Sequence, residues 1–391
     1  MSLPSLPFRF APPANGRVDL LVIAGEHSGD EQAARVVAGL REREPALAVC
    51  ALGGTRLAQA GAQLLHEMTA MSAIGYFEVI RNYRPYFRPL FQETLRWIGE
   101  HRPRAVLFVD YGGFNLRMAD ALRGAGLSRK GGGGIRTLYY ISPQVWASRP
   151  GRRFTLARTI DALAVIFPFE VESYADTGLA AEFVGHPFVA PDYRPPVRFD
   201  PSGPVLLLPG SRKKAVARIF PAILAGYQNG TFRPAVVLHP GGDIGAMLAG
   251  ELRRSPGGQV TLKSVDEQLA SGEPLAAAAV LTSSGTMSMH CALAGIPGAI
   301  AYRADTLTYW LGRWLVKIPY LGIANLLLGE AMYPEFIQGA ATPAALAAQL
   351  RASLQDPARV ERTAGQSARL HALLSRPAAG TAVDWLGRHL G

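Results

Sequence analysis

Short, nearly uninterrupted apolar runs recur along the chain, separated by longer stretches with the spacing of helices. Strands of this kind are buried on both faces, which occurs almost only in parallel sheets covered by helices on both sides. The chain therefore predicts an α/β architecture. A proline-rich stretch at 185–204, which suits neither a helix nor a central strand, predicts a hinge between two such halves. The runs lie at 18–25, 46–54, 105–110, 137–142 and 162–168, and then at 205–210, 235–240, 277–285 and 298–303.

The length of the chain sets the number of domains. It has 391 residues, 49% of them hydrophobic, which is enough for two domains that each bury a core. We expect Rossmann-like domains over residues 1–187 and 188–345, followed by alanine- and leucine-rich helices over 346–391. Ligands of such sheets bind at the carboxyl ends of the strands, so the polar residues that follow each strand are the candidates for function.

The number of cysteines and the length of the apolar runs indicate the cellular compartment of the protein. Cys50 and Cys291 are the only cysteines, and neither has a partner at CxxC or metal-ligand spacing, so no disulfide framework or zinc site is expected. The first residues lack the basic-then-apolar order of a signal peptide. No run reaches the roughly 18 apolar residues of a spanning helix. We expect a protein of the reducing cytosol.

The charge balance favours partners that carry phosphate. The formal net charge is +10, from 40 Lys and Arg against 30 Asp and Glu. Nucleic acid is disfavoured, because no basic run interleaved with stacking aromatic residues and no helix-turn-helix pattern is present. Anionic lipid and a nucleotide substrate remain.

Two loops of the second half have the chemistry of diphosphate binding. Pro209-Gly210-Ser211-Arg212 follows one apolar run and Ser283-Ser284-Gly285-Thr286 follows another, each just before a predicted helix. Backbone amides at a positive helix end, a hydroxyl and a guanidinium suit a nucleotide diphosphate. Neither a GxxxxGK[ST] loop nor an Asp-x-Asp metal motif is present, so we expect chemistry without a metal ion.

Polar residues also follow the runs of the first half. The loop Gly25 to Asp30 opens a helix and predicts either a ligand contact or a helix cap by Ser28 or Asp30. Asp110 ends a buried run and predicts either a carboxylate that accepts a proton or a cap of the next helix. His186, in a Gly-His-Pro turn, is expected to be structural.

Two segments, 69–98 and 307–329, combine aromatic and aliphatic residues with arginines or a lysine. Each suits a helix at a membrane interface or an acyl-chain groove, or else a core helix whose arginines extend to solvent. For the first segment both readings stay open, and for the second the structural reading is favoured.

The motifs together resemble the lipid-A-disaccharide synthases, glycosyltransferases of the GT-B fold, over roughly residues 19–338. The stretches that carry the resemblance are AGEHSGD, MSAIGYFEV, FVDYGGFN, YYISPQVWASR, FPFE, FVGHP, LLPGSR, SSGTMSMHCAL, AYR and NLLLGEAMYPEFIQ.

This resemblance implies two Rossmann-like domains whose parallel sheets face an interdomain cleft, with residues 346–391 packing back on the N-terminal domain. It implies an inverting, metal-independent transfer of 2,3-diacylglucosamine from UDP-2,3-diacylglucosamine to 2,3-diacylglucosamine 1-phosphate, giving lipid A disaccharide 1-phosphate and UDP. The expected partners are these two acylated sugars, with no cofactor and no nucleic acid. The expected location is the cytoplasm, in peripheral contact with the inner membrane, as a step of lipopolysaccharide biosynthesis.

The resemblance also implies roles for residues. Asp110 matches the catalytic Asp of the family's D-x-x-x-F-N motif, and Arg212 matches the Arg of PGSR. The expected catalytic residues are Asp110, Glu26 and Asn115. The expected substrate-binding residues are Ser28, Gly29, Asp30, Gly210, Ser211, Arg212, Ser284, Gly285, Thr286, His290, Asn325, Glu335 and Gln338.

Four positions depart from the family's pattern. His27 replaces an alanine, Gly113 a second Asp, Ala215 a glutamate, and His290 a glutamate suited to the ribose hydroxyls. A carboxylate accepts from two vicinal hydroxyls, whereas a neutral imidazole offers one acceptor and one donor. Two alternatives therefore stand beside the main hypothesis: a GT-B relative with a changed donor or acceptor, and a non-catalytic paralogue that binds lipid or nucleotide.

Overall fold

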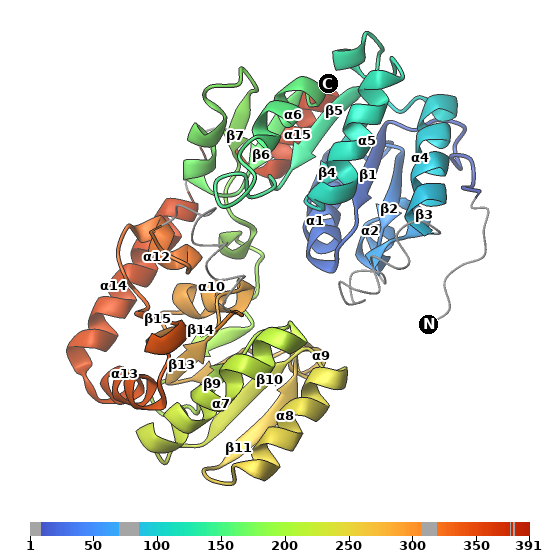
Figure 1. The fold of residues 1–391 in the computed structure, drawn as a ribbon. Helices are drawn as coiled ribbons and strands as arrows, with labels where there is room; N and C mark the ends of the chain where they lie inside the picture. Colours follow the sequence, from blue (N-terminus) through green and yellow to red (C-terminus); the bar gives the residue numbers. More distant parts are fainter. Residues whose placement is uncertain (1–8, 70–85, 306–318, 376, 378–379) are drawn as a thin grey trace. The chain divides into compact units, whose positions relative to one another are not determined.

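The computed structural model describes residues 9–69, 86–305, 319–375, 377 and 380–391. The chain forms two compact units, and the division falls between Pro187 and Phe188 (Figure 1). The first unit consists of Met1–Pro187 and Arg376–Gly391, and the second of Phe188–Ser375. The last residues of the chain therefore return to the unit in which it begins.

The described part of the first unit contains a seven-stranded parallel sheet in the order β3-β2-β1-β4-β5-β6-β7 (Figure 1). The strand order reverses between β1 and β4, and open sheets of this kind bind ligands at that point. The strands are β1 (Leu20–Ala24), β2 (Val49–Gly53), β3 (Gln63–Glu67), β4 (Ala105–Val109), β5 (Arg136–Tyr140), β6 (Ala162–Val165) and β7 (Ala181–Phe183).

Helices cover both faces of this sheet, because successive side chains of a strand point to opposite sides. Leu21 and Ile23 of β1 lie in one buried cluster, while Leu20 and Val22 lie in the other. The first cluster contains residues of α4 (Arg88–His101), α5 (Gly112–Gly124) and α6 (Arg152–Thr159). The second contains residues of α1 (His27–Arg43), α2 (Thr55–Gln59) and α15 (Ala382–Leu390).

The described part of the second unit contains a six-stranded parallel sheet in the order β11-β10-β9-β13-β14-β15, and a separate pair, β12-β8. Its order reverses between β9 and β13. The strands are β8 (Val197–Phe199), β9 (Val205–Leu208), β10 (Ala235–His239), β11 (Val260–Ser264), β12 (Leu275–Ala277), β13 (Ala279–Thr282), β14 (Gly298–Tyr302) and β15 (Glu335–Ile337). The helices are α7 (Lys213–Gly230), α8 (Gly242–Arg254), α9 (Val265–Ala270), α10 (Thr286–Leu293), α12 (Ile323–Leu328), α13 (Pro343–Gln355) and α14 (Pro357–Leu374).

The C-terminal helices divide between the units, whereas we expected all of 346–391 on the first domain. Helices α13 and α14 belong to the second unit, where α13 packs on α7 and Leu346 lies against Gly226. Only α15 joins the first unit. It buries Trp385, and Arg43 forms an ion pair of 2.7 Å with Asp384. Small residues on α7 let α13 approach closely, which explains why α13 stays with the second sheet.

All nine predicted apolar runs contain strands, and short strands of mixed polarity were missed. One of them, β8, lies inside the predicted hinge and pairs with β12. Residues 70–85 of the first amphipathic segment and 307–318 of the second lie outside the described residues. The described remainder of the first segment forms most of α4, whose Trp97 is buried in the core. Among the described helices, none combines the length and the apolar composition that a bilayer crossing requires.

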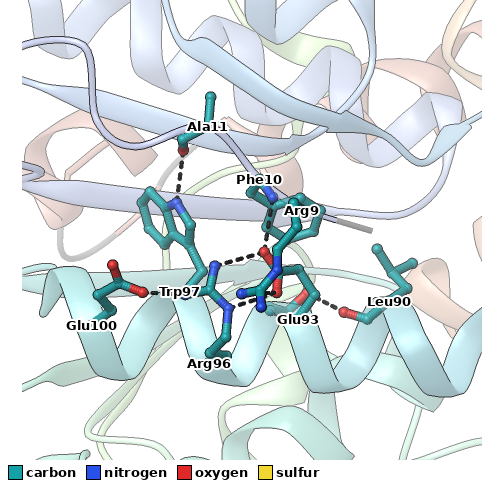
Figure 2. Close-up of polar contacts among 9 residues, drawn as sticks. Arg9, Phe10, Ala11, Leu90, Glu93, Arg96, Trp97 and Glu100 are labelled. Atoms are coloured by element: carbon teal, nitrogen blue, oxygen red, sulfur yellow. Dashed lines mark hydrogen bonds and ion pairs between the residues drawn. The ribbon is translucent and has the colours of Figure 1, made fainter. Parts of the chain in front are cut away.

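The N-terminal segment is fastened along α4 by one buried carboxylate (Figure 2). Glu93 accepts a hydrogen bond from the amide of Phe10 at 2.8 Å and two from the guanidinium of Arg96 at 2.7 and 2.8 Å. The indole of Trp97 donates to the carbonyl of Ala11 at 2.9 Å. The Arg96 hydrogen bonds hold the pKa of Glu93 below its usual range.

We expect Glu93→Gln to lower the free energy of unfolding by about 1–3 kcal/mol at pH 7, because the substitution weakens bonds to a charged acceptor. A depressed carboxyl pKa stabilises the fold above the unfolded-state value of roughly 4.3, and the contribution is lost as the pH falls through the folded-state pKa. Urea unfolding should therefore show a larger deficit at pH 7 than at pH 3. Glu100→Gln, which alters an exposed partner of the same arginine, is the control. An equal deficit at both pH values would contradict the assignment.

Candidate active site

The turn that follows β4 has an unusual backbone. Asp110 and Tyr111 have positive φ values of 45° and 46°, and Ile141, after the neighbouring strand β5, has a φ of 63°. Such values strain residues other than glycine and are often found at functional sites. Gly25, after β1, makes room for this turn, since a Cβ atom there would lie 2.3 Å from the Tyr111 ring. The residues that follow the neighbouring strands β1, β4 and β5 thus lie together around Asp110.

Two side chains hold the strained turn through a single carbonyl. The Asn115 amide donates to the carbonyl oxygen of Asp110 at 2.8 Å, and the Tyr139 hydroxyl donates to the same oxygen. Asn115 and Tyr139 have no exposed surface. Of the predicted catalytic residues, Asn115 therefore positions the backbone of Asp110, and Tyr139 is a second partner that was not among the predicted site residues.

The carboxyl group of Asp110 is half-buried and electrostatically perturbed. Burial raises its pKa to about 6, and the negative charge of Glu26 contributes to the rise, while the amide of Tyr111 opposes it. Glu26 is exposed and precedes α1. A carboxyl group with a pKa near neutrality can accept a proton from a reacting hydroxyl.

A second perturbed carboxyl group, Glu170, lies in the same unit. Its side chain accepts hydrogen bonds from the Trp146 indole and the Phe167 amide, both at 3.1 Å. Burial raises its pKa to about 7, and the charge of Asp110 adds to the shift. Glu170 is the last residue of the FPFE motif and was not among the predicted site residues, although its position soon after β6 could have identified it.

The loop from Glu26 to Asp30 divides into an open and a buried part. Ser28 is exposed and Gly29 is buried at the start of α1. Asp30 faces inward, and its carboxylate accepts from the amides of Gly54 at 2.7 Å and Arg56 at 3.0 Å. It caps α2, a helix that begins 25 residues later. The capping reading of Asp30 is therefore the one that the contacts favour, although the capped helix is not its own.

In the second unit, the two predicted anion loops lie side by side because β9 and β13 are paired. A Cβ atom on Gly210, which has a φ of 103°, would lie 2.9 Å from the Ser283 hydroxyl. Each loop opens a helix: Arg212 is the N-cap of α7, and Gly285 is the N-cap of α10. The exposed residues of the two loops are Ser211, Arg212, Gly285 and Thr286, and Ser284 is half-buried.

His290 lies in an aromatic stack. Its ring centroid is 4.0 Å from that of Phe188 and 5.7 Å from that of Tyr193, and the imidazole is almost parallel to the tyrosine ring. Burial lowers its pKa to about 4, so the imidazole is neutral at physiological pH. The stack packs Phe188 and Tyr193, at the beginning of the second unit, against α10.

Asn325 lies in α12, Glu335 begins β15, the neighbour of β14, and Gln338 follows β15 directly. The Asn325 amide donates to Glu335 at 2.9 Å, and Glu335 accepts from the amides of Leu321 and Gly322 at 2.8 and 2.9 Å. Gln338 donates to and accepts from the backbone of Ala304. These three polar side chains hold the segments before α12 and after β14 against β15, and these contacts are with the chain itself.

The departures from the family's pattern fall at different depths. Gly113 is exposed on the first turn of α5 with open space where a side chain would project, and Ala215 is half-buried on α7. His27 is exposed as the first residue of α1.

Within the described ranges, no group of three His, Cys, Asp or Glu residues could hold a metal ion.

Solved structures of glycosyltransferases share this fold. Rice Os79 in complex with UDP has a TM-score of 0.62 at 12% identity, covering 95% of this chain and 100% of its own. The calicheamicin glycosyltransferase CalG4 has a TM-score of 0.55 at 14% identity, covering 96% and 99%. At these identities the likeness concerns the fold alone, and it confirms the predicted GT-B class with parallel sheets in two domains.

Sequence relatives are more specific. The family model for lipid-A-disaccharide synthetase matches residues 20–379. The lipid-A-disaccharide synthase of Geobacter sulfurreducens is 33% identical over 95% of this chain and 98% of its own length. That of Myxococcus xanthus is 33% identical over 85% and 87%. The chain therefore belongs to the lipid-A-disaccharide synthase family of glycosyltransferases.

Proposed function

We propose that this chain transfers 2,3-diacylglucosamine from UDP-2,3-diacylglucosamine to the 6-hydroxyl of 2,3-diacylglucosamine 1-phosphate, with inversion at the anomeric carbon. The observation that carries the proposal is Asp110, a carboxylate with a pKa of about 6 held on a strained turn at the carboxyl edge of the first sheet. Membership of the lipid-A-disaccharide synthase family supports this choice of substrates.

In this mechanism the Asp110 carboxylate takes the proton of the 6-hydroxyl while that oxygen forms a bond to the anomeric carbon of the donor. The bond from this carbon to the diphosphate oxygen breaks on the opposite face, which inverts the configuration and releases UDP. Negative charge then accumulates on the diphosphate. Arg212 and the amides that open α7 and α10 are suited to stabilise it.

We also propose that the reaction needs no metal ion and takes place at the membrane surface. The leaving-group charge is neutralised by Arg212 and helix ends, so the transfer needs no metal ion. Both substrates carry acyl chains, and the net charge of +10 suits the anionic surface of the cytoplasmic leaflet, so the enzyme acts in peripheral contact with the inner membrane.

A mass-spectrometric transfer assay in detergent should yield the disaccharide 1-phosphate equally with and without EDTA. Absence of product would remove this function.

A second candidate function rests on His290. Its stacked, neutral imidazole cannot accept from two ribose hydroxyls at once, as a carboxylate would. This favours a GT-B relative with a changed nucleotide-sugar donor. Hydrolysis or transfer measured over a panel of UDP- and GDP-linked sugars separates the two, since exclusive use of the diacylated UDP donor excludes the second candidate.

We expect Asp110→Asn to lower kcat by about a hundredfold or more, because an amide cannot take the hydroxyl proton. Binding of UDP should persist. Steady-state transfer and calorimetric titration with UDP test both statements. Asp120→Asn, on the exposed side of α5, serves as the matched control and should keep full activity. Unchanged turnover in the Asp110 variant would remove its role.

The pH profile gives an independent test of the same group. We expect kcat/KM to fall on the acid side with an apparent pKa of about 6, because protonated Asp110 cannot act as a base. Glu26→Gln removes a negative charge that raises the pKa of Asp110, so the acid limb should move to lower pH. Glu31→Gln, whose carboxylate pairs with Arg35 on α1, should leave the limb in place. A limb that does not move in the Glu26 variant would exclude this coupling.

We expect Arg212→Ala to weaken UDP binding by about ten- to a hundredfold, the range for loss of a charge-assisted hydrogen bond. Calorimetric titration with UDP measures the change. Arg218→Ala removes an arginine of the same helix that pairs with Asp305, and it should bind UDP as the parent protein does. Equal affinity in the Arg212 variant would place the diphosphate elsewhere.

A further inference from the structure

Four arginines of α6 and the turn before it, Arg149, Arg152, Arg153 and Arg158, have two kinds of surroundings. Arg153 forms a bidentate pair with Asp176, with its closest contact at 2.7 Å, and Arg158 lies 4.0 Å from Asp120. Arg149 and Arg152 differ: among the described residues, neither guanidinium has a carboxylate or carbonyl partner. Half of the positive charge on this short stretch is therefore not neutralised by the described part of the protein.

The two unpaired arginines are close to each other. The amide of Arg152 donates to the carbonyl of Arg149 at 3.0 Å, so both belong to one turn, and Arg149 has a positive φ of 52°. Burial lowers the pKa of Arg152, and the positive charge of Arg149 lowers it further. Two like charges held together without a counter-ion are stabilised by an anion that binds both.

Arg152 also lies beside the Asp110 turn. A Cβ atom on Gly112 would be 3.7 Å from Nη1 of Arg152, and Gly112 begins α5 two residues after Asp110. The charge of Arg152 acts on Tyr139, whose hydroxyl donates to the Asp110 carbonyl. The unpaired guanidinium therefore lies within the reach of a sugar whose hydroxyl contacts Asp110.

We propose that Arg149 and Arg152 bind the phosphate of the acceptor sugar while its 6-hydroxyl meets Asp110, an assignment that rests on the proposed function. In the acceptor, the carbon that bears the phosphate and the carbon that carries C6 flank the ring oxygen, so the phosphate and the 6-hydroxyl lie on neighbouring parts of the sugar. The phosphate's negative charge would otherwise add to those of Asp110 and Glu26, and two guanidiniums offset it. This subsite distinguishes the phosphorylated acceptor from an unphosphorylated sugar.

Binding of glucosamine 1-phosphate to the full chain, followed by 31P line broadening, tests the subsite without any turnover. We expect broadening with the parent protein and with Arg158→Gln, and an affinity at least about tenfold weaker in the double variant R149Q/R152Q. Inorganic phosphate, observed in the same way, shows whether the phosphate alone is recognised, and it too should lose affinity in the double variant. No broadening with the parent protein, or equal broadening in the double variant, would overturn the assignment.

Kinetics provide the second readout and separate the two proposals. In the transfer assay, the double variant should raise KM for the acceptor about tenfold or more and leave the UDP dissociation constant unchanged. An unchanged acceptor KM would also overturn the subsite. If the double variant loses the affinity for glucosamine 1-phosphate that the parent protein shows, but the parent protein makes no disaccharide, the phosphate subsite holds and the proposed transfer fails.

Discussion

Every strand pair that the structure describes is parallel, and this constraint determines where chemistry can occur. Parallel neighbours need a crossover connection, the crossovers place helices on both faces, and strands between two helical layers must be apolar. Val205 to Leu208 of β9 are accordingly all buried. Polar groups are left to the strand ends, which all lie at one edge of each sheet, and there Asp110 follows β4 and Arg212 follows β9.

The first unit concentrates strain at that edge. Non-glycine residues in the left-handed region cost roughly 1–3 kcal/mol each and persist only where their surroundings hold them. Asp110 and Tyr111 are held by two buried donors on one carbonyl and by the missing side chain of Gly25. The outcome is a carboxyl group fixed near a second carboxylate in a poorly hydrated place, the environment that raises its pKa toward neutrality.

Several polar residues of the shared motifs shape loops. Asp30 caps α2, Asn115 positions the Asp110 carbonyl, and Glu335 accepts hydrogen bonds from the amides that precede α12. A polar residue in a motif thus has two possible duties, and the hydrogen bonds distinguish them. Some polar side chains, including those of Ser28, Arg152 and Arg212, make no hydrogen bond or ion pair with the described residues. They are the better candidates for direct substrate contact.

The sequence by itself determined the α/β class, the two sheets and the strand ends, because buried parallel strands must be apolar and their ends polar. It also indicated the family through long motifs. Only the tertiary structure decided which polar groups meet: Asp30 with α2, His290 with Phe188 and Tyr193, and α15 with the first sheet. It also revealed Tyr139, Glu170 and Arg152 near Asp110. These contacts join residues far apart in the chain, and a short strand such as β15 is defined by its pairing with a neighbour, so neither periodicity nor spacing could specify them.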